Sequence, residues 1–243
     1  MTIFDDLEIE EERIDAILHG LDPDGWETPS GAPGWSISDV VLHLAQSEET
    51  VVASASGAMR RPMQANSAGG SVDEVMERRV QDERGDHGII LDRWRSARRH
   101  ALELLRSADP DARLPWVVNA FKPATLATTR LAEHWAHALD ITTPLGIEYA
   151  DTHRLRHVAW LGHRMFPYAF ASAGSEPEAV FCELVGPGGE HWLFGPPGAA
   201  SSISGPAGDF CRVGAQRLDP DRSGLATKGP HGSAALRILR NYA

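Results

Sequence analysis

The chain has 243 residues, 42% of them hydrophobic, which is typical of a soluble globular protein with one large domain or two modest ones. Its formal net charge of -11 disfavours a broad phosphate-binding surface, so we expect no nucleic acid partner. It has no apolar run near the roughly 20 residues that cross a bilayer, and its acidic start is unlike a signal peptide. We therefore predict a cytoplasmic protein without a membrane partner.

The first half of the chain predicts helices. Five segments have either apolar residues at helical spacing or a capping pattern at their start: residues 6–21, 36–51, 71–84, 89–108 and 124–141. Within the second segment, Ser36 and Asp39 have the spacing of a capping box. The four longer segments, joined by short or irregular links, predict an antiparallel bundle over residues 1–150, and the interior of such a bundle is a usual place for metal sites.

The links between these helices contain turn and breaker residues. Residues 22–35 are rich in proline and glycine, and residues 58–70 have no hydrophobic period, so we expect a surface loop there. Pro110, Pro115 and Pro123 mark a second connection, before the last helix of the bundle.

The last third predicts a different structure. Residues 151–173 still predict a helix, whereas residues 179–185 and 191–194 flank a Pro-Gly-Gly turn and predict a β-hairpin. A further strand is expected at residues 201–205, followed by short helices over 209–217 and 233–242. Residues 151–243 are therefore expected to form a helix and a small α+β domain.

Two distant segments carry residues suited to binding a metal. Glu133 and His137 are four residues apart on a predicted helix, so both lie on one face. His43, on another predicted helix, would complete a three-ligand site. A set of two histidines and one carboxylate, with open coordination positions, is typical of a catalytic metal and not of a structural zinc.

Spacing alone leaves a simpler interpretation open. Glu133 and His137, on the predicted helix 124–141, belong to a longer polar stripe, which could face water while apolar residues pack elsewhere. The stripe consists of Arg130, Glu133, His137 and Asp140. His43 lies between two leucines and could be a core histidine whose ring nitrogen bonds to a carbonyl.

Other histidines also have a spacing that would suit a metal ligand. His134 is the local competitor of His137, but its use would turn Glu133 away from the site. His153 and His157 also have the spacing of a helical pair, without a carboxylate in register, so we expect them to be surface or interdomain residues.

The sequence also resembles a known family. Trp26, the run of residues 33–45 and Glu48 look like the opening of the mycothiol-dependent maleylpyruvate isomerase family, within the wider DinB-like superfamily. The run from Arg130 to Asp140 resembles that family's second motif. The resemblance implies a mainly α protein, with a DinB-like four-helix bundle followed by a small α+β C-terminal domain.

The resemblance also implies roles for particular residues. Position by position, His43, Glu133 and His137 match the family's metal ligands. Arg217 falls where the C-terminal domain offers a catalytic arginine toward the cleft, and Asp140 could orient His137 from behind. Residues 54–88 match no part of the family's pattern, so no substrate-binding residue is assigned there, and the residues of the thiol-binding site stay unassigned.

These residues imply a function for the protein. We expect a metal-dependent isomerase or S-transferase that acts on a small electrophile, with mycothiol as the thiol cosubstrate. The ligand set suits Zn²⁺, although Ni²⁺, Fe²⁺ or Mn²⁺ are compatible with it. The alternative is a non-catalytic metal-binding protein, in which the same residues hold an ion that staples the bundle. The sequence specifies neither the substrate nor the oligomeric state.

Overall fold

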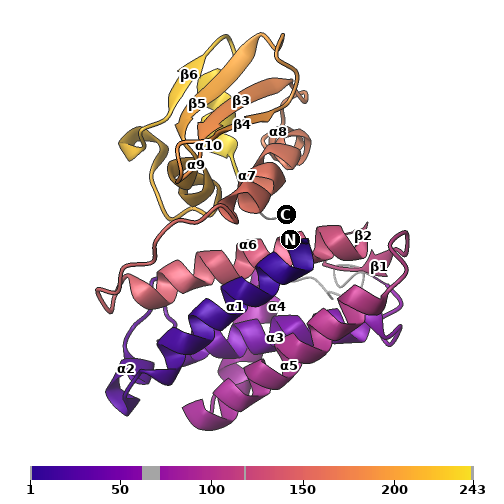
Figure 1. Ribbon diagram of the computed structural model, residues 1–243, viewed down its shortest axis with the longest axis vertical. Coiled ribbons are helices and arrows are strands. Elements are labelled where there is room, and N and C mark those ends of the chain that lie inside the picture. Colours follow the sequence, from indigo (N-terminus) through magenta and orange to yellow (C-terminus); the bar gives the residue numbers. More distant parts are fainter. Residues whose placement is uncertain (1, 62–71, 118, 242–243) are drawn as a thin grey trace. The chain divides into compact units, whose positions relative to one another are not determined.

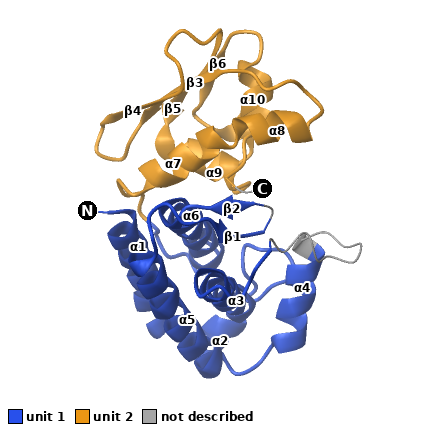
Figure 2. Cartoon of the chain, turned by 90° about the vertical axis from the view of Figure 1, so that its right-hand side faces the viewer, with its two compact units in different colours: residues 1–149 blue, residues 150–243 orange. Residues whose placement is uncertain are grey.

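The computed structural model describes residues 2–61, 72–117 and 119–241. The chain divides into two compact units, Met1–Tyr149 and Ala150–Ala243 (Figure 2). Across the described ranges, no helix combines the length and the hydropathy needed to cross a membrane. The predicted mainly α fold with a small C-terminal sheet is confirmed.

The first unit is a helical bundle (Figure 1). Its described helices are α1 (Ile3–His19), α2 (Pro23–Glu27), α3 (Ile37–Ala55), α4 (Val72–Glu83), α5 (His87–Ser107) and α6 (Pro123–Thr142). The long helices α1, α3, α5 and α6 pack against one another, as the predicted bundle requires. Their apolar faces meet in a core that fully buries Ile14, Leu42, Trp94 and Leu131.

The start of α3 is held by the predicted capping box. The Ser36 side chain accepts a hydrogen bond from the Asp39 backbone N–H, and the Asp39 side chain accepts one from the Ser36 N–H. Arg84, which follows α4, donates two hydrogen bonds of 2.9 Å to the Asp39 carboxylate. The start of α3, which leads to His43, is therefore tied to the end of α4.

Two links contain short elements that the sequence did not predict. The turn-rich segment holds α2, where Asp22 caps the helix and Pro23 occupies its first turn. The proline-marked connection contains strand β1 (Leu114–Pro115), which pairs with β2 (Ala120–Phe121). Both are too short for hydrophobic periodicity to reveal. Most of the predicted loop, residues 62–70, and the start of the following helix lie outside the described residues.

The second unit combines helices with a mixed sheet. Its described helices are α7 (Leu155–Arg164), α8 (Phe166–Ser172), α9 (Ala207–Gly214) and α10 (Gly232–Ile238), with a short 3-10 turn η2 (Pro220–Arg222). Its described strands are β3 (Val180–Val185), β4 (His191–Phe194), β5 (Ser201–Pro206) and β6 (Ala226–Lys228), arranged in the order β4-β3-β5-β6. The predicted β3–β4 hairpin is confirmed, and β5 joins the other side of β3 in parallel.

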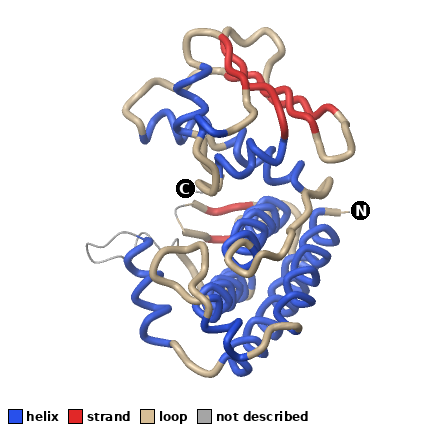
Figure 3. Tube along the Cα trace, turned by 90° about the vertical axis from the view of Figure 1, so that its left-hand side faces the viewer, coloured by secondary structure: helices blue, strands red, loops and turns tan. Residues whose placement is uncertain are grey.

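Side chains alternate across this sheet, whose strands are red in Figure 3. One face carries the buried Cys182, Trp192 and Ile203, and helices α7, α9 and α10 contact the strands. The other face exposes alternate residues, including Glu183 and Leu193. The α+β character expected for this part of the chain is therefore present.

The single helix predicted over residues 151–173 is wrong. The chain forms α7, which ends at Arg164, and then α8, which begins at Phe166 and has Pro167 in its first turn. Proline lacks an N–H donor, and its ring would collide with the carbonyl four residues earlier in a continuous helix. Pro167 therefore separates two helices that apolar spacing had joined.

Candidate metal centre

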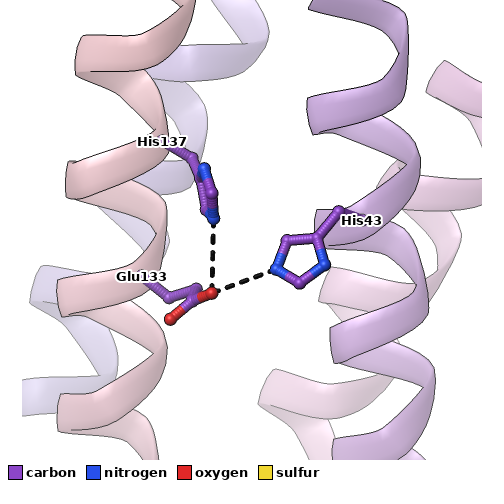
Figure 4. A group of neighbouring side chains, drawn as sticks. All are labelled: His43, Glu133 and His137. Carbon is purple, nitrogen blue, oxygen red and sulfur yellow. Dashed lines mark hydrogen bonds and ion pairs between the residues drawn. The ribbon is translucent and has the colours of Figure 1, made fainter. Parts of the chain in front are cut away.

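The three side chains predicted as metal ligands come together between α3 and α6 (Figure 4). Nε2 of His43 lies 3.1 Å from Oε1 of Glu133, and Nε2 of His137 lies 3.3 Å from the same oxygen. The two imidazole rings have centroids 5.0 Å apart, at 68°. Although His43 and Glu133 are 90 residues apart in sequence, the packing of the two helices brings them into contact.

These donor atoms fit a divalent metal. Three ligands at about 2.0–2.2 Å from one tetrahedral ion lie roughly 3.3 Å from one another. The nitrogen-to-oxygen separations of 3.1 and 3.3 Å match that spacing. His43 Nδ1 is buried and has no hydrogen-bond partner among the described residues. The Nε2 atoms of both histidines point toward the carboxylate, as shared coordination would require.

The charges at the centre favour a cation. Burial alone would raise the pKa of Glu133, but hydrogen bonds with His137 and His43 hold it well below its usual range. Burial would lower the pKa of His137, but its hydrogen bonds to Asp140 and Glu133 raise it to about 9. Burial lowers the pKa of His43. In the metal-free protein, a proton on His137 thus supplies positive charge between two carboxylates.

Asp140 holds His137 from behind. Its Oδ2 atom accepts a hydrogen bond of 2.9 Å from His137 Nδ1, which leaves Nε2 directed at Glu133. The Asp140 backbone carbonyl accepts a hydrogen bond of 2.8 Å from the Gly31 N–H. A Cβ atom at position 31 would lie only 2.9 Å from Asp140 Oδ1, so this close approach requires glycine.

Trp35, for which the sequence predicted no role, covers one side of the centre. Its ring centroid lies 5.1 Å from that of His43 and 6.4 Å from that of His137. Its Nε1–H donates a hydrogen bond to Glu77 of α4. Trp35 also lines a cavity of about 500 Å³, together with Ser30, Ser38, Asp39 and Arg84. The only sequence signal for this residue was its place within the run of residues 33–45.

The polar stripe of α6 does not face water. Arg130 and Asp140 are each 2% exposed and His137 is 9% exposed, whereas the Glu133 side chain is about one-third exposed. The interpretation of this stripe as a solvated helix face is therefore wrong. The neighbouring His134 is fully buried, but it points away from the centre, toward Trp94 and the Arg130 carbonyl.

The remaining predicted residues lie in the second unit. Arg217 follows α9, and its Nη1 donates a hydrogen bond of 2.7 Å to the Ala215 carbonyl. Its catalytic role stays a prediction. His153 is exposed and His157 is half-buried, near the start of α7.

A helical bundle in which two facing helices bring together two imidazoles and a carboxylate defines a protein of the DinB-like class. Residues 7–142 match the family described as the mycothiol maleylpyruvate isomerase N-terminal domain, and the chain belongs to this family. It is also 34% identical over 245 residues to uncharacterized proteins from two strains of Mycobacterium tuberculosis, covering 98% of this chain and 94% of each relative.

Solved structures share the fold. A mycothiol-dependent maleylpyruvate isomerase superposes with a TM-score of 0.62 at 14% identity, covering 94% of this chain and 95% of that chain. A histidine-to-alanine mutant of such an isomerase superposes with a TM-score of 0.61 at the same identity and coverage. At this identity the likeness describes architecture, and the reaction has to be argued from the site.

Proposed function

We propose that this protein is a metal-dependent enzyme that uses mycothiol as cosubstrate and acts on a small electrophile as an isomerase or S-transferase. The observation that carries the proposal is the convergence of His43, Glu133 and His137, since three protein donors leave coordination positions open for an exogenous ligand. Membership in the mycothiol maleylpyruvate isomerase family supports a thiol as that ligand.

The residues around the centre have distinct roles in this proposal. A divalent ion held there, with Zn²⁺ the best fit to the donors, would supply the positive charge that favours a thiolate at neutral pH. Glu133 stays anionic and offsets part of that charge. Asp140 fixes the proton of His137 on Nδ1, so that the Nε2 lone pair faces the centre. The Trp35 ring excludes water from one side.

The thiol chemistry then has two outcomes. The thiolate adds to one carbon of an activated double bond, which leaves a single bond about which the substrate rotates. Expulsion of the same thiolate restores the double bond as the other isomer. If the adduct takes up a proton instead, the product is a thioether and the reaction is an S-transfer. We propose that Arg217 pairs with a carboxylate of the substrate.

Thiol binding tests this proposal directly. Purified protein is prepared metal-free and Zn²⁺-loaded, and each form is titrated with mycothiol by calorimetry. We expect tight binding to the loaded form only, because the metal-free centre lacks the charge that stabilises a thiolate. Maleylpyruvate, the compound named for the structural relatives, then serves as the probe electrophile. Isomer formation identifies an isomerase, and thioether formation identifies a transferase. If the Zn²⁺-loaded protein does not bind mycothiol, the result would favour the alternative of a non-catalytic metal-binding protein.

Metal affinity is expected to rise with pH. In the metal-free protein His137 keeps its proton up to a pKa of about 9, so a binding ion must displace that proton. Displacing one proton makes the apparent affinity rise about tenfold per pH unit below this pKa and level off above it. Chelator competition at a series of pH values measures the slope.

The Asp140→Asn variant provides the control. It replaces the carboxylate whose hydrogen bond and charge raise the His137 pKa with a neutral amide, so the plateau should begin at lower pH. An affinity that does not change with pH in the wild-type protein would contradict the prediction.

A further inference from the structure

Two charged residues of the sequence motifs have no part in the chemistry above. Glu48 is 1% exposed and Arg130 is 2% exposed, although isolated charges are rarely buried so deeply. Arg130 Nε donates a hydrogen bond of 2.7 Å to Glu48 Oε1. Glu48 follows His43 on α3 by five residues, and Arg130 precedes Glu133 on α6 by three. This ion pair therefore links the two helices that carry the candidate ligands, about one turn from each ligand position.

The surroundings of this pair resemble a second metal site. Donor atoms of Glu11, Glu48 and His134 lie within 4.8 Å of one another, and all three residues are buried. Both carboxylate oxygens of Glu11 have no hydrogen-bond partner among the described residues. The chemistry of the donors nevertheless disfavours a metal here.

Both ring nitrogens of His134 are already used. Nδ1 lies 2.9 Å from the Arg130 carbonyl, which can only accept a hydrogen bond, so Nδ1 carries the proton. Nε2 then accepts a hydrogen bond of 3.2 Å from the Trp94 indole N–H. Burial and the neighbouring Glu48 raise the pKa of Glu11 well above its usual range, which favours its neutral form. Burial raises the pKa of Glu48 as well, against the opposing charge and hydrogen bond of Arg130. The 2.7 Å contact itself therefore identifies Glu48 as the partner of the Arg130 guanidinium.

The Arg130 side chain is fixed on several sides. Besides its bond to Glu48, its guanidinium carbon lies 5.5 Å from the centroid of the Trp116 ring. Burial would lower the pKa of Arg130, but the charges of Glu48 and Glu133 raise it, so the guanidinium stays charged. Arg130 thus connects the buried pair to α6, three residues before the candidate ligand Glu133.

We propose that Glu48 and Arg130 are positioning residues, whose ion pair sets the spacing and rotation of α3 and α6 so that His43 meets Glu133. This inference rests on the proposed metal centre, and it adds residues that touch no metal, thiol or substrate. The helices would still pack through their apolar faces without the pair, but the contact of 3.1 Å between His43 and Glu133 would no longer be enforced.

The test measures Zn²⁺ affinity by chelator competition in Glu48→Gln, in Arg130→Met and in the double variant. We expect each single substitution to weaken affinity by about 10- to 100-fold, the range found for residues that support metal ligands. Glu49→Gln is the matched control, because Glu49 is the next residue on α3 and forms an ion pair with Arg93 of α5. Its affinity should stay within about twofold of wild type, since it does not link α3 to α6.

The signs of the two single effects separate positioning from a simple charge effect. If only the local field mattered, loss of the Glu48 charge would weaken Zn²⁺ binding and loss of the Arg130 charge would strengthen it. Positioning requires both to weaken it. Opposite signs would overturn the proposal, and so would wild-type affinity in either single variant.

The double variant separates positioning from stability. It leaves no unpaired buried charge, so the melting temperature of the metal-free protein should recover toward wild type. Positioning predicts that its Zn²⁺ affinity stays low, whereas recovery of affinity together with stability would overturn the proposal. If a single variant does not fold, the Zn²⁺ affinity of the double variant provides the test. A wild-type protein that binds no Zn²⁺ would refute the metal centre itself, which is a different result from normal binding in the variants.

Discussion

Alanine at His43 or at His137 is expected to reduce bound Zn²⁺ from about one ion per chain to the background level. Each substitution removes one of three protein donors, and the remaining imidazole and carboxylate would bind far more weakly. His137→Ala has a second effect, because the buried Asp140 carboxylate loses the imidazole that it holds. Elemental analysis of the purified variants and chelator competition measure the loss.

A histidine outside the centre provides the control for this prediction. His153 is exposed and belongs to the second unit, so His153→Ala should retain the wild-type metal content. The Zn²⁺ content of Asp140→Asn should lie between that of the ligand variants and that of His153→Ala, since Asp140→Asn keeps all three donors but changes the group that holds His137. Full Zn²⁺ content in either His43→Ala or His137→Ala would mean that the ion binds elsewhere.

Trp94→Ala is expected to destabilise the protein by about 3–5 kcal/mol, the usual cost of truncating a buried tryptophan. Trp94 lies on α5 with 0% exposure, and its indole N–H is the donor to His134 Nε2. The substitution therefore leaves a cavity in the bundle and also an imidazole nitrogen without its partner. Urea unfolding, followed by circular dichroism, measures the change in the free energy of unfolding.

Two further variants separate these contributions. Trp94→Phe keeps much of the aromatic volume but removes the donor, so its cost should be clearly smaller than that of alanine. Trp160→Ala is the surface control, because Trp160 is 37% exposed, and it should cost less than about 1 kcal/mol. Equal costs for Trp94→Ala and Trp160→Ala would show that Trp94 is not a central packing residue.

Local sequence patterns predicted most of the helices and the hairpin. The capping box at Ser36 is decided by neighbouring atoms, so the start of α3 could be read from four residues. Apolar spacing located α5 and α6 to within a few residues, because one face of each helix must be buried. The same spacing missed the break at Pro167, where a single missing N–H outweighed the apolar pattern.

The candidate ligands show how far such patterns reach. The separation of Glu133 and His137 follows from the pitch of one helix, so the sequence could place both on one face. It could not tell whether that face meets water or α3, because periodicity describes a helix and not its neighbour. The family resemblance favoured a face that is buried against another helix. The packing of α3 against α6 brings His43 to this face.

The contacts that support the centre depend on folding of the whole first unit. Trp35 reaches the two imidazoles from a loop, and Glu48 meets Arg130 across 82 residues of sequence. In the same way, β5 pairs in parallel with β3 although β4 lies between them in the sequence, and no local pattern predicts this pairing. Short-range hydrogen bonding and hydrophobic spacing are encoded in neighbouring residues, whereas the pairing of distant charges and rings arises only when the helices pack and exclude water.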